Sequence, residues 1–84
     1  MEDKTLTIRI LTPEGTLHEG TASAVFLPGA VSPFEVLPGH GAIISALSAG
    51  PVRVVSGGQE LRFDVRGGVA RVLDNVITVC AETA

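Results

Sequence analysis

Apolar and polar residues alternate with a period of two along most of this 84-residue chain. The alternation is clearest near the start, where Leu6, Ile8 and Ile10 are separated by polar residues. Successive side chains of a β-strand point to opposite faces of the sheet, so this pattern predicts a strand with one buried face. The same reasoning predicts further strands at 16–19, 21–27, 34–37, 52–55, 60–66, 69–73 and 76–81. The segment 42–47 fits a strand or a helical turn by periodicity alone, and its β-branched Ile43 and Ile44 with the flanking glycine and proline residues favour a strand.

Turn residues separate the predicted strands. Pro13 begins a turn before Gly15, Ser56-Gly57-Gly58-Gln59 has the glycines of a hairpin loop, and Asp74-Asn75 predicts another turn. Gly20 is expected to end the strand at 16–19, and Gly67-Gly68 is expected to form a turn. Strands at a spacing of about eight to twelve residues, with turns between them, predict a single all-β sandwich or barrel.

The expected inward and core residues follow from the same alternation. Within 60–66, Leu61, Phe63 and Val65 are predicted to point inward. Cys80 lies in a β-branched apolar run and is predicted to be a small core residue. Because it is the only cysteine, the chain can form no internal disulfide, and a reducing compartment fits best.

Composition and charge exclude several classes of function. The net charge is −3 at pH 7, and the six lysine and arginine residues are spread along the chain. Nucleic-acid binding needs a concentrated basic face, so no nucleic-acid partner is expected. Met1 is followed by two acidic residues, which does not fit a signal peptide, and no run approaches the ~20 apolar residues of a transmembrane helix.

Candidate catalytic groups are few. A metal site built on His18 or His40 would need carboxylates such as Glu19 or Glu35, and the spacing does not support one. His18 is expected to be a half-exposed strand residue. A nucleophile such as Ser45 lacks the G-x-S-x-G context, and the glycine pairs lack phosphate-binding spacing. The sequence therefore predicts no active site and no cofactor.

His40 lies in an unusual setting, the motif Pro38-Gly39-His40-Gly41 directly before the apolar segment 42–47. Proline fixes the backbone and glycine allows a sharp turn, so the imidazole is expected at the tip of a rigid corner. Such a corner can hold a catalytic base, a metal ligand or a contact for another protein. The alternative is a turn residue that forms only local hydrogen bonds.

Four segments together resemble the amino-terminal domain of the epsilon subunit of F-type ATP synthase. They are residues 10–16, the Pro-Gly-His corner together with the apolar segment 42–47 that follows it, the segment Arg66-Gly67-Gly68-Val69, and residues 76–84. The resemblance covers essentially the whole chain, in order. It implies a flattened sandwich of two antiparallel five-stranded sheets, about ten short strands in all.

The resemblance also implies a mechanical function. The family's domain lies at the foot of the central stalk, packs on the gamma subunit and touches the c-ring, with the alpha/beta catalytic head in the same complex. It couples proton transport to ATP synthesis without itself making or breaking bonds. The implied location is peripheral, at the cytoplasmic face of the bacterial inner membrane. The expected partner-contact residues are Val31, Ser32, Pro38, Gly39, His40, Gly41, Ala42 and Ile43.

Two departures from the family pattern affect these expectations. Val31 stands where many members have a carboxylate facing the ring, and Pro33 stiffens a loop that is usually rich in glycine. Many members also continue past the Ala-Glu-Thr-Ala segment into two helices that can inhibit ATP hydrolysis. The sequence given ends at Ala84, so no inhibition by such helices is expected from it.

Other classes of function also use small all-β domains. A biotinyl or lipoyl carrier is a small all-β domain as well, but it needs a lysine at a hairpin tip. Lys4 is the only lysine and lies near the amino terminus. A small β-barrel enzyme using His40, or a protein-interaction module unrelated to ATP synthase, are the remaining alternatives. Because the alternation supports a closed sandwich, the isolated chain is expected to be a folded monomer.

Overall fold

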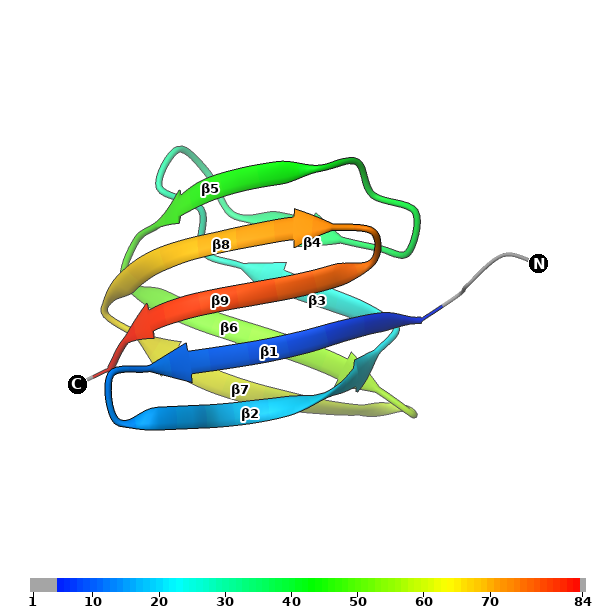
Figure 1. The fold of residues 1–84 in the computed structure, drawn as a ribbon, viewed down its shortest axis with the longest axis horizontal. Coiled ribbons are helices and arrows are strands. Elements are labelled where there is room, and N and C mark those ends of the chain that lie inside the picture. The colour runs from blue at the N-terminus through cyan, green and yellow to red at the C-terminus, as the bar shows by residue number, and fades with distance from the viewer. Residues whose placement is uncertain (1–4, 84) are drawn as a thin grey trace.

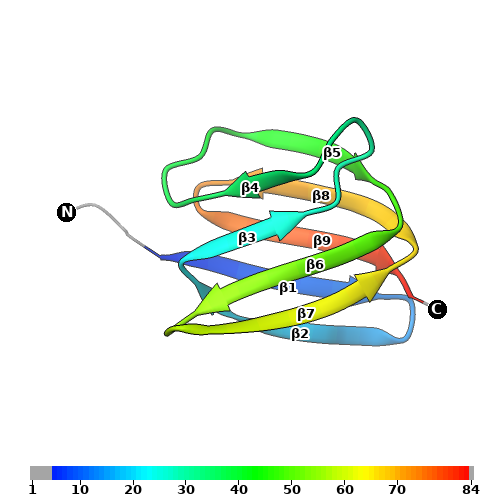
Figure 2. The ribbon, with the colours of Figure 1, turned by 180° about the vertical axis from the view of Figure 1, so that it is seen from behind.

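The computed structural model describes residues 5–83, which form a two-layered β-sandwich (Figures 1 and 2). The expected all-β sandwich is confirmed. Lys4, the only lysine and so the only candidate carrier site, and Ala84 lie outside the described residues. The nine strands are β1 Leu6–Thr12, β2 Gly15–Ala22, β3 Ala24–Leu27, β4 Phe34–Val36, β5 Ile43–Leu47, β6 Gly50–Ser56, β7 Gln59–Val65, β8 Gly67–Leu73 and β9 Val76–Glu82.

One sheet has the strand order β2-β1-β9-β8-β5, and the other has the order β4-β3-β6-β7. The described residues thus form five plus four strands, whereas the resemblance implied two five-stranded sheets. The expectation that both sheets are antiparallel is wrong for one pair, because β1 lies parallel to β9, with Ile8 opposite Ile77. A period of two is the same in parallel and antiparallel strands, so the alternation could not distinguish them.

The core lies between the inner faces of the two sheets. In β1, Leu6, Ile8 and Ile10 are fully buried, as their alternation predicted. Burying an aliphatic side chain of this size contributes roughly 1.5 to 3 kcal/mol, so each of these positions adds substantially to the stability of the sandwich. The other side chains that are buried in the core come from both sheets and include Val25, Leu27, Val36, Val52, Val54, Val72, Ile77 and Val79.

Two glycine predictions are wrong. Gly20 does not end a strand, because β2 continues to Ala22 and the break comes at Ser23, whose N–H donates to the Val55 carbonyl over 2.8 Å. Gly67 and Gly68 do not form a turn but begin β8. Gly68 has φ +145°, and a Cβ there would overlap the carbonyl oxygen of Cys80. Glycine at this position therefore permits close backbone approach between β8 and β9.

Two burial predictions also fail. Cys80 is exposed, because its neighbours Val79 and Ala81 take the inward positions of β9. Leu61 has the inward parity of Phe63 and Val65 but is 43% exposed, since the Gln59 end of the edge strand β7 extends beyond the core. Alternation gives the face that a residue occupies, and the length of overlap between the sheets decides its burial.

The isolated chain is expected to unfold in one cooperative transition as a monomer with a β-type circular dichroism spectrum. The physical reason is that both inner faces contribute to one continuous core, so neither sheet keeps its buried side when the other is lost. Thermal melting followed at two wavelengths, with sedimentation to give the mass, checks this. A disordered spectrum for the chain alone would contradict it.

Candidate partner-contact surface

The structure separates the predicted contact residues into two groups. The loop 30–33, which contains Val31 and Ser32, connects β3 to β4 at one end of the sandwich. The Pro38-Gly39-His40-Gly41 corner connects β4 to β5 at the opposite end (Figures 1 and 2). Because β4 and β5 span the distance between the two ends, one small contact cannot include both groups. They are two distinct candidate surfaces.

The corner is a hydrogen-bonded turn. The His40 N–H donates to the Leu37 carbonyl over 3.1 Å, and Gly39 has φ +86°, a conformation that glycine adopts without strain. His40 is exposed at the tip, as the sequence predicted. Pro38 is half-buried, while Gly41 and Ala42 are exposed and Ile43 turns toward the core.

Asn75 anchors the corner to the rest of the fold. Its Oδ1 accepts a hydrogen bond of 2.7 Å from the Gly39 N–H, and its backbone carbonyl accepts one of 2.8 Å from the Thr7 N–H. Asp74 and Asn75 have φ of 51° and 64°, which are the positive values of a tight hairpin turn between β8 and β9. One turn residue thus connects the corner, this hairpin and the start of β1.

The His40 ring has one hydrogen bond in the structure. Its Nδ1 lies 2.8 Å from the carbonyl oxygen of Gly41. The bond is local and on the surface, so it orients the ring at the corner. The other histidine, His18, is half-buried as predicted and packs on Phe63, with ring centroids 5.1 Å apart.

The loop 30–33 is held at its base and exposed at its tip. The Ala30 N–H donates to the Ala46 carbonyl over 2.9 Å, and the Ser48 N–H donates to the Pro28 carbonyl over 2.8 Å. These bonds tie the loop's base to the end of β5. Val31 is 102% exposed, so its apolar side chain makes almost no contact with the rest of the domain. Ser32 beside it is also exposed.

An apolar surface continues from the corner over the outer face of β5, β8 and β9. It carries four exposed aliphatic side chains, the most open being Ile44 at 75%; the members of this outer apolar surface are Ile44, Val69, Leu73 and Val76. Leu73 lies opposite Val76 in the hairpin, and Ile43 lies opposite Val72, so the chain leaves the corner beside Leu73. The corner and this surface are therefore contiguous.

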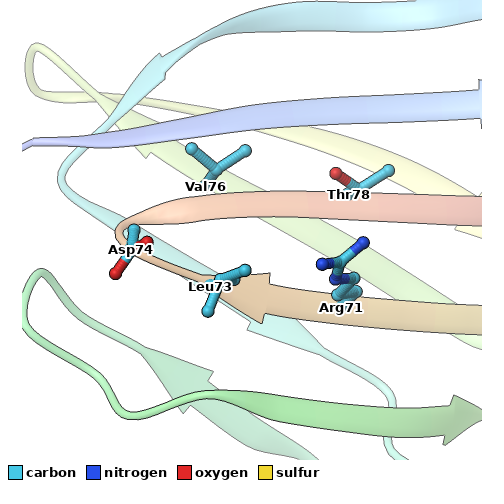
Figure 3. Close-up of a pocket in the computed structure, with 5 residues that line it drawn as sticks. All are labelled: Arg71, Leu73, Asp74, Val76 and Thr78. Carbon is cyan, nitrogen blue, oxygen red and sulfur yellow. The ribbon is translucent and has the colours of Figure 1, made fainter.

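A shallow depression crosses the part of this surface nearest the hairpin turn. Figure 3 shows the side chains that line it, which project from the outer side of β8 and β9. Leu73 and Val76 form its apolar part, and Arg71 and Thr78 lie opposite each other farther along the strands. Arg71 also lies opposite Ile44, between Val69 and Leu73 on the same face of β8. Exposed aliphatic side chains around an arginine are a composition typical of a protein interface.

The outer face of the four-stranded sheet is different in character. Arg53 pairs with Glu60 at 3.5 Å and stacks over the Phe26 ring at 4.3 Å, and Arg62 pairs with Asp64 at 3.1 Å. These charged groups satisfy one another on the surface. The contrast makes the outer apolar surface, and not this face, the candidate for a protein contact.

Sequence reasoning missed three members of this surface and its anchor, Asn75. The pattern predicts strands at Val69, Leu73 and Val76 but was not used to say which face of the sheet their side chains occupy. At Asn75 it predicts only a turn. The signal for the first three is that each occupies the parity opposite to a buried residue such as Val72 or Ile77. The bond from Asn75 to Gly39 joins residues 36 positions apart and leaves no local pattern.

The described residues show no cluster that suggests a metal site. Across residues 5–83 there is no group of three or more histidine, cysteine or acidic side chains close enough to hold a metal ion. No helix that could cross a membrane occurs in the same part of the chain. The features that remain to be explained are the two exposed loops and the outer apolar surface.

Comparison with known proteins finds relatives with similar sequences. Curated proteins named ATP synthase epsilon chain are similar along nearly the whole chain: that of Desulfitobacterium hafniense is 35% identical over 80 residues, and that of Hydrogenovibrio crunogenus is 39% identical over 77. These alignments cover 95% and 92% of this chain. They cover 61% and 54% of the relatives, so the chain spans little more than half of their length.

Solved structures share the fold. A chain of the Euglena gracilis mitochondrial ATP synthase, solved with its F1 part and c-ring, matches 96% of this chain with a TM-score of 0.88 at 19% identity, over 52% of its own length. A chain of the Tetrahymena thermophila mitochondrial enzyme, from a structure of the central stalk and c-ring, matches 98% with a TM-score of 0.77 at 15% identity, over 66% of its own length.

A family model settles the relationship. The model described as the β-sandwich domain of the ATP synthase delta/epsilon chain matches residues 5–84. This range contains all nine strands, the corner and the loop 30–33. The chain therefore belongs to the family of ATP synthase delta/epsilon chains, and residues 5–84 correspond to the β-sandwich domain of that family.

Proposed function

We propose that this chain is a non-catalytic component of the central stalk of F-type ATP synthase, which links the gamma subunit to the c-ring and turns with them. The observation that carries this proposal is the extent of the family match, from residue 5 to residue 84. In the assembly, the domain transmits rotation between proton transport and the alpha/beta catalytic head. It breaks no bond itself.

The separation of the two exposed loops supports two contacts. The corner and the contiguous outer apolar surface offer the larger area, and we assign them to gamma. The loop 30–33, at the other end of the sandwich, is assigned to the c-ring. Val31 supplies an apolar side chain there, so the ring contact of this chain depends on apolar packing and not on a carboxylate.

The proposed location follows from the complex. ATP synthase is attached to a membrane, and the chain is peripheral to it through its partners. The curated relatives described above are bacterial proteins. This supports a place at the cytoplasmic face of the bacterial cell membrane.

The direct test is association with the gamma subunit of the same organism. We expect a one-to-one complex by size-exclusion chromatography and calorimetry. An absence of binding with both proteins at about 10 µM, which corresponds to a binding free energy weaker than about −7 kcal/mol, would contradict the proposal. A carrier domain or an unrelated interaction module would give that negative result.

His40→Ala should weaken gamma binding while leaving the fold nearly intact. The side chain is exposed at a turn tip, so the change in stability is expected within ~0.5 kcal/mol. Loss of one interfacial hydrogen bond costs about 0.5 to 1.5 kcal/mol, or roughly two- to twelve-fold in affinity. Thermal melting beside a gamma titration measures both. A large fall in melting temperature with normal binding by the folded protein would make His40 a structural turn residue.

A further inference from the structure

The hydrogen bond of the His40 ring determines which of its two nitrogens carries the proton. A carbonyl oxygen can only accept, and Nδ1 lies 2.8 Å from the carbonyl oxygen of Gly41, so Nδ1 must be the donor. A neutral imidazole has one protonated nitrogen. Nε2 is therefore left as an acceptor with a free lone pair.

The surroundings of the corner leave this acceptor open. His40 is exposed, and an added Cβ at Gly39 or at Gly41 would meet no atom within 4 Å. A partner can thus approach the corner's backbone without displacing a side chain.

The corner is also held in place before any partner arrives. The Gly39 N–H is bonded to Asn75 Oδ1 at 2.7 Å, and the His40 N–H to the Leu37 carbonyl at 3.1 Å. Asn75 is in turn bonded to Thr7 of β1, a central strand of its sheet. Preorganisation of this kind reduces the entropy lost on binding.

We propose that the corner is a preorganised acceptor site, in which His40 Nε2 receives a hydrogen bond from a donor group of gamma and Asn75 is the residue that positions it. The inference rests on the proposed function for the identity of the partner. It adds the chemistry of the contact: the matching group on gamma is an N–H or O–H donor, such as an amide, a hydroxyl or a basic side chain. The tautomer of His40 and the hydrogen bond from Gly39 to Asn75 are properties of this chain alone, whatever its partner.

The first experiment needs no partner. Long-range nitrogen–proton NMR correlations of the ¹⁵N-labelled chain, recorded as the pH is raised until the ring signals stop changing, distinguish the two tautomers of the neutral ring. We expect Nδ1 to be protonated and Nε2 unprotonated in His40, with His40→Ala used to assign its signals. A ring protonated mainly on Nε2 would overturn the inference whether or not gamma binds.

The second experiment replaces the hydrogen-bond acceptor at position 40 with a donor. Lysine is a donor without an acceptor, so His40→Lys places a donor against the donor of gamma. We expect it to bind gamma more weakly than His40→Ala, by about threefold or more, while His40→Gln retains an acceptor and binds more tightly than either. If His40→Lys binds more tightly than His40→Ala, the group on gamma is an acceptor and the inference is wrong.

The third experiment tests the positioning role of Asn75. Asn75→Gly keeps the positive φ of the turn but removes the side chain that holds Gly39. We expect gamma affinity to fall about three- to tenfold at a nearly unchanged melting temperature. The matched control is the exchange Asp74→Asn with Asn75→Asp, which preserves the net charge and an acceptor at position 75 and should bind within about twofold of the original chain.

The outcomes separate the two proposals. If the original chain does not bind gamma, the proposed function fails, and the tautomer measurement still decides which nitrogen of His40 carries the proton. If the original chain binds and Asn75→Gly binds equally well, the proposed function stands and the positioning role of Asn75 is wrong.

Discussion

Gly68→Ala is expected to destabilise the sandwich by about 2 to 5 kcal/mol, the largest effect of any substitution proposed for this chain. The added Cβ would overlap the Cys80 carbonyl oxygen and lie 3.0 Å from the Ala81 Cα, in the middle of the sheet. Overpacking of this kind costs about 1 to 3 kcal/mol. The φ of +145° adds strain of a similar size for any residue with a side chain. For a domain of this length, such a loss is a large share of the total stability.

Two control variants separate the two causes. Gly15→Ala has a comparable φ of +132° but open space around the new Cβ, so only the strain remains. Gly41→Ala has neither a positive φ nor a contact within 4 Å and should be nearly neutral. Urea denaturation should rank the three losses of stability as Gly68 above Gly15 above Gly41. Equal stabilities for Gly68→Ala and Gly41→Ala would show that β8 and β9 are not packed as described.

Ile44→Asp is expected to weaken binding to gamma by about 30-fold or more, the loss of about 2 kcal/mol that is typical of a central interface residue. Ile44 is 75% exposed, so the folded chain alone gains little from it. Burial of a carboxylate against gamma without a partner adds a desolvation cost. The stability of the isolated chain should change by about 1 kcal/mol or less.

Two comparisons make this prediction specific. Ile44→Val keeps an apolar, β-branched side chain and should bind within about fourfold of the original chain, because the loss of one methylene costs about 0.8 kcal/mol at most. Asp64→Asn changes the outer face of the opposite sheet, where Arg62 pairs with Asp64, and should leave gamma binding unchanged. Isothermal calorimetry gives all three affinities. Normal binding by Ile44→Asp would remove the outer apolar surface from the contact.

Much of this fold was predictable from local patterns. Leu6, Ile8 and Ile10 identified the buried face of β1, and the glycines at 57 and 58 identified the β6–β7 hairpin, where both have positive φ. The signals are local because strand alternation and turn conformation depend on adjacent residues. The position of His40 at an exposed corner was predictable for the same reason.

Features that depend on distant parts of the chain were not predictable. The parallel pairing of β1 with β9 joins the two ends of the sequence, and no periodicity reports it. The need for glycine at position 68 arises from the carbonyl of Cys80, and the need for Asn75 arises from the N–H of Gly39. The candidate site was therefore predicted as a motif, while its anchor and the surface next to it came from the tertiary structure.

The central claim, that gamma docks on the corner and the outer apolar surface, is tested most directly by thiol footprinting. In a Cys80→Ser background, which removes the only natural thiol, single cysteines are introduced by His40→Cys, Ile44→Cys and Asp64→Cys. Maleimide labelling is followed by mass spectrometry with and without gamma. At a free gamma concentration of ten times Kd, about one chain in eleven is unbound. We therefore expect gamma to slow labelling about tenfold at positions 40 and 44 and to leave position 64 unchanged. Protection at position 64 with free labelling at positions 40 and 44 would place gamma on the opposite sheet and contradict the account.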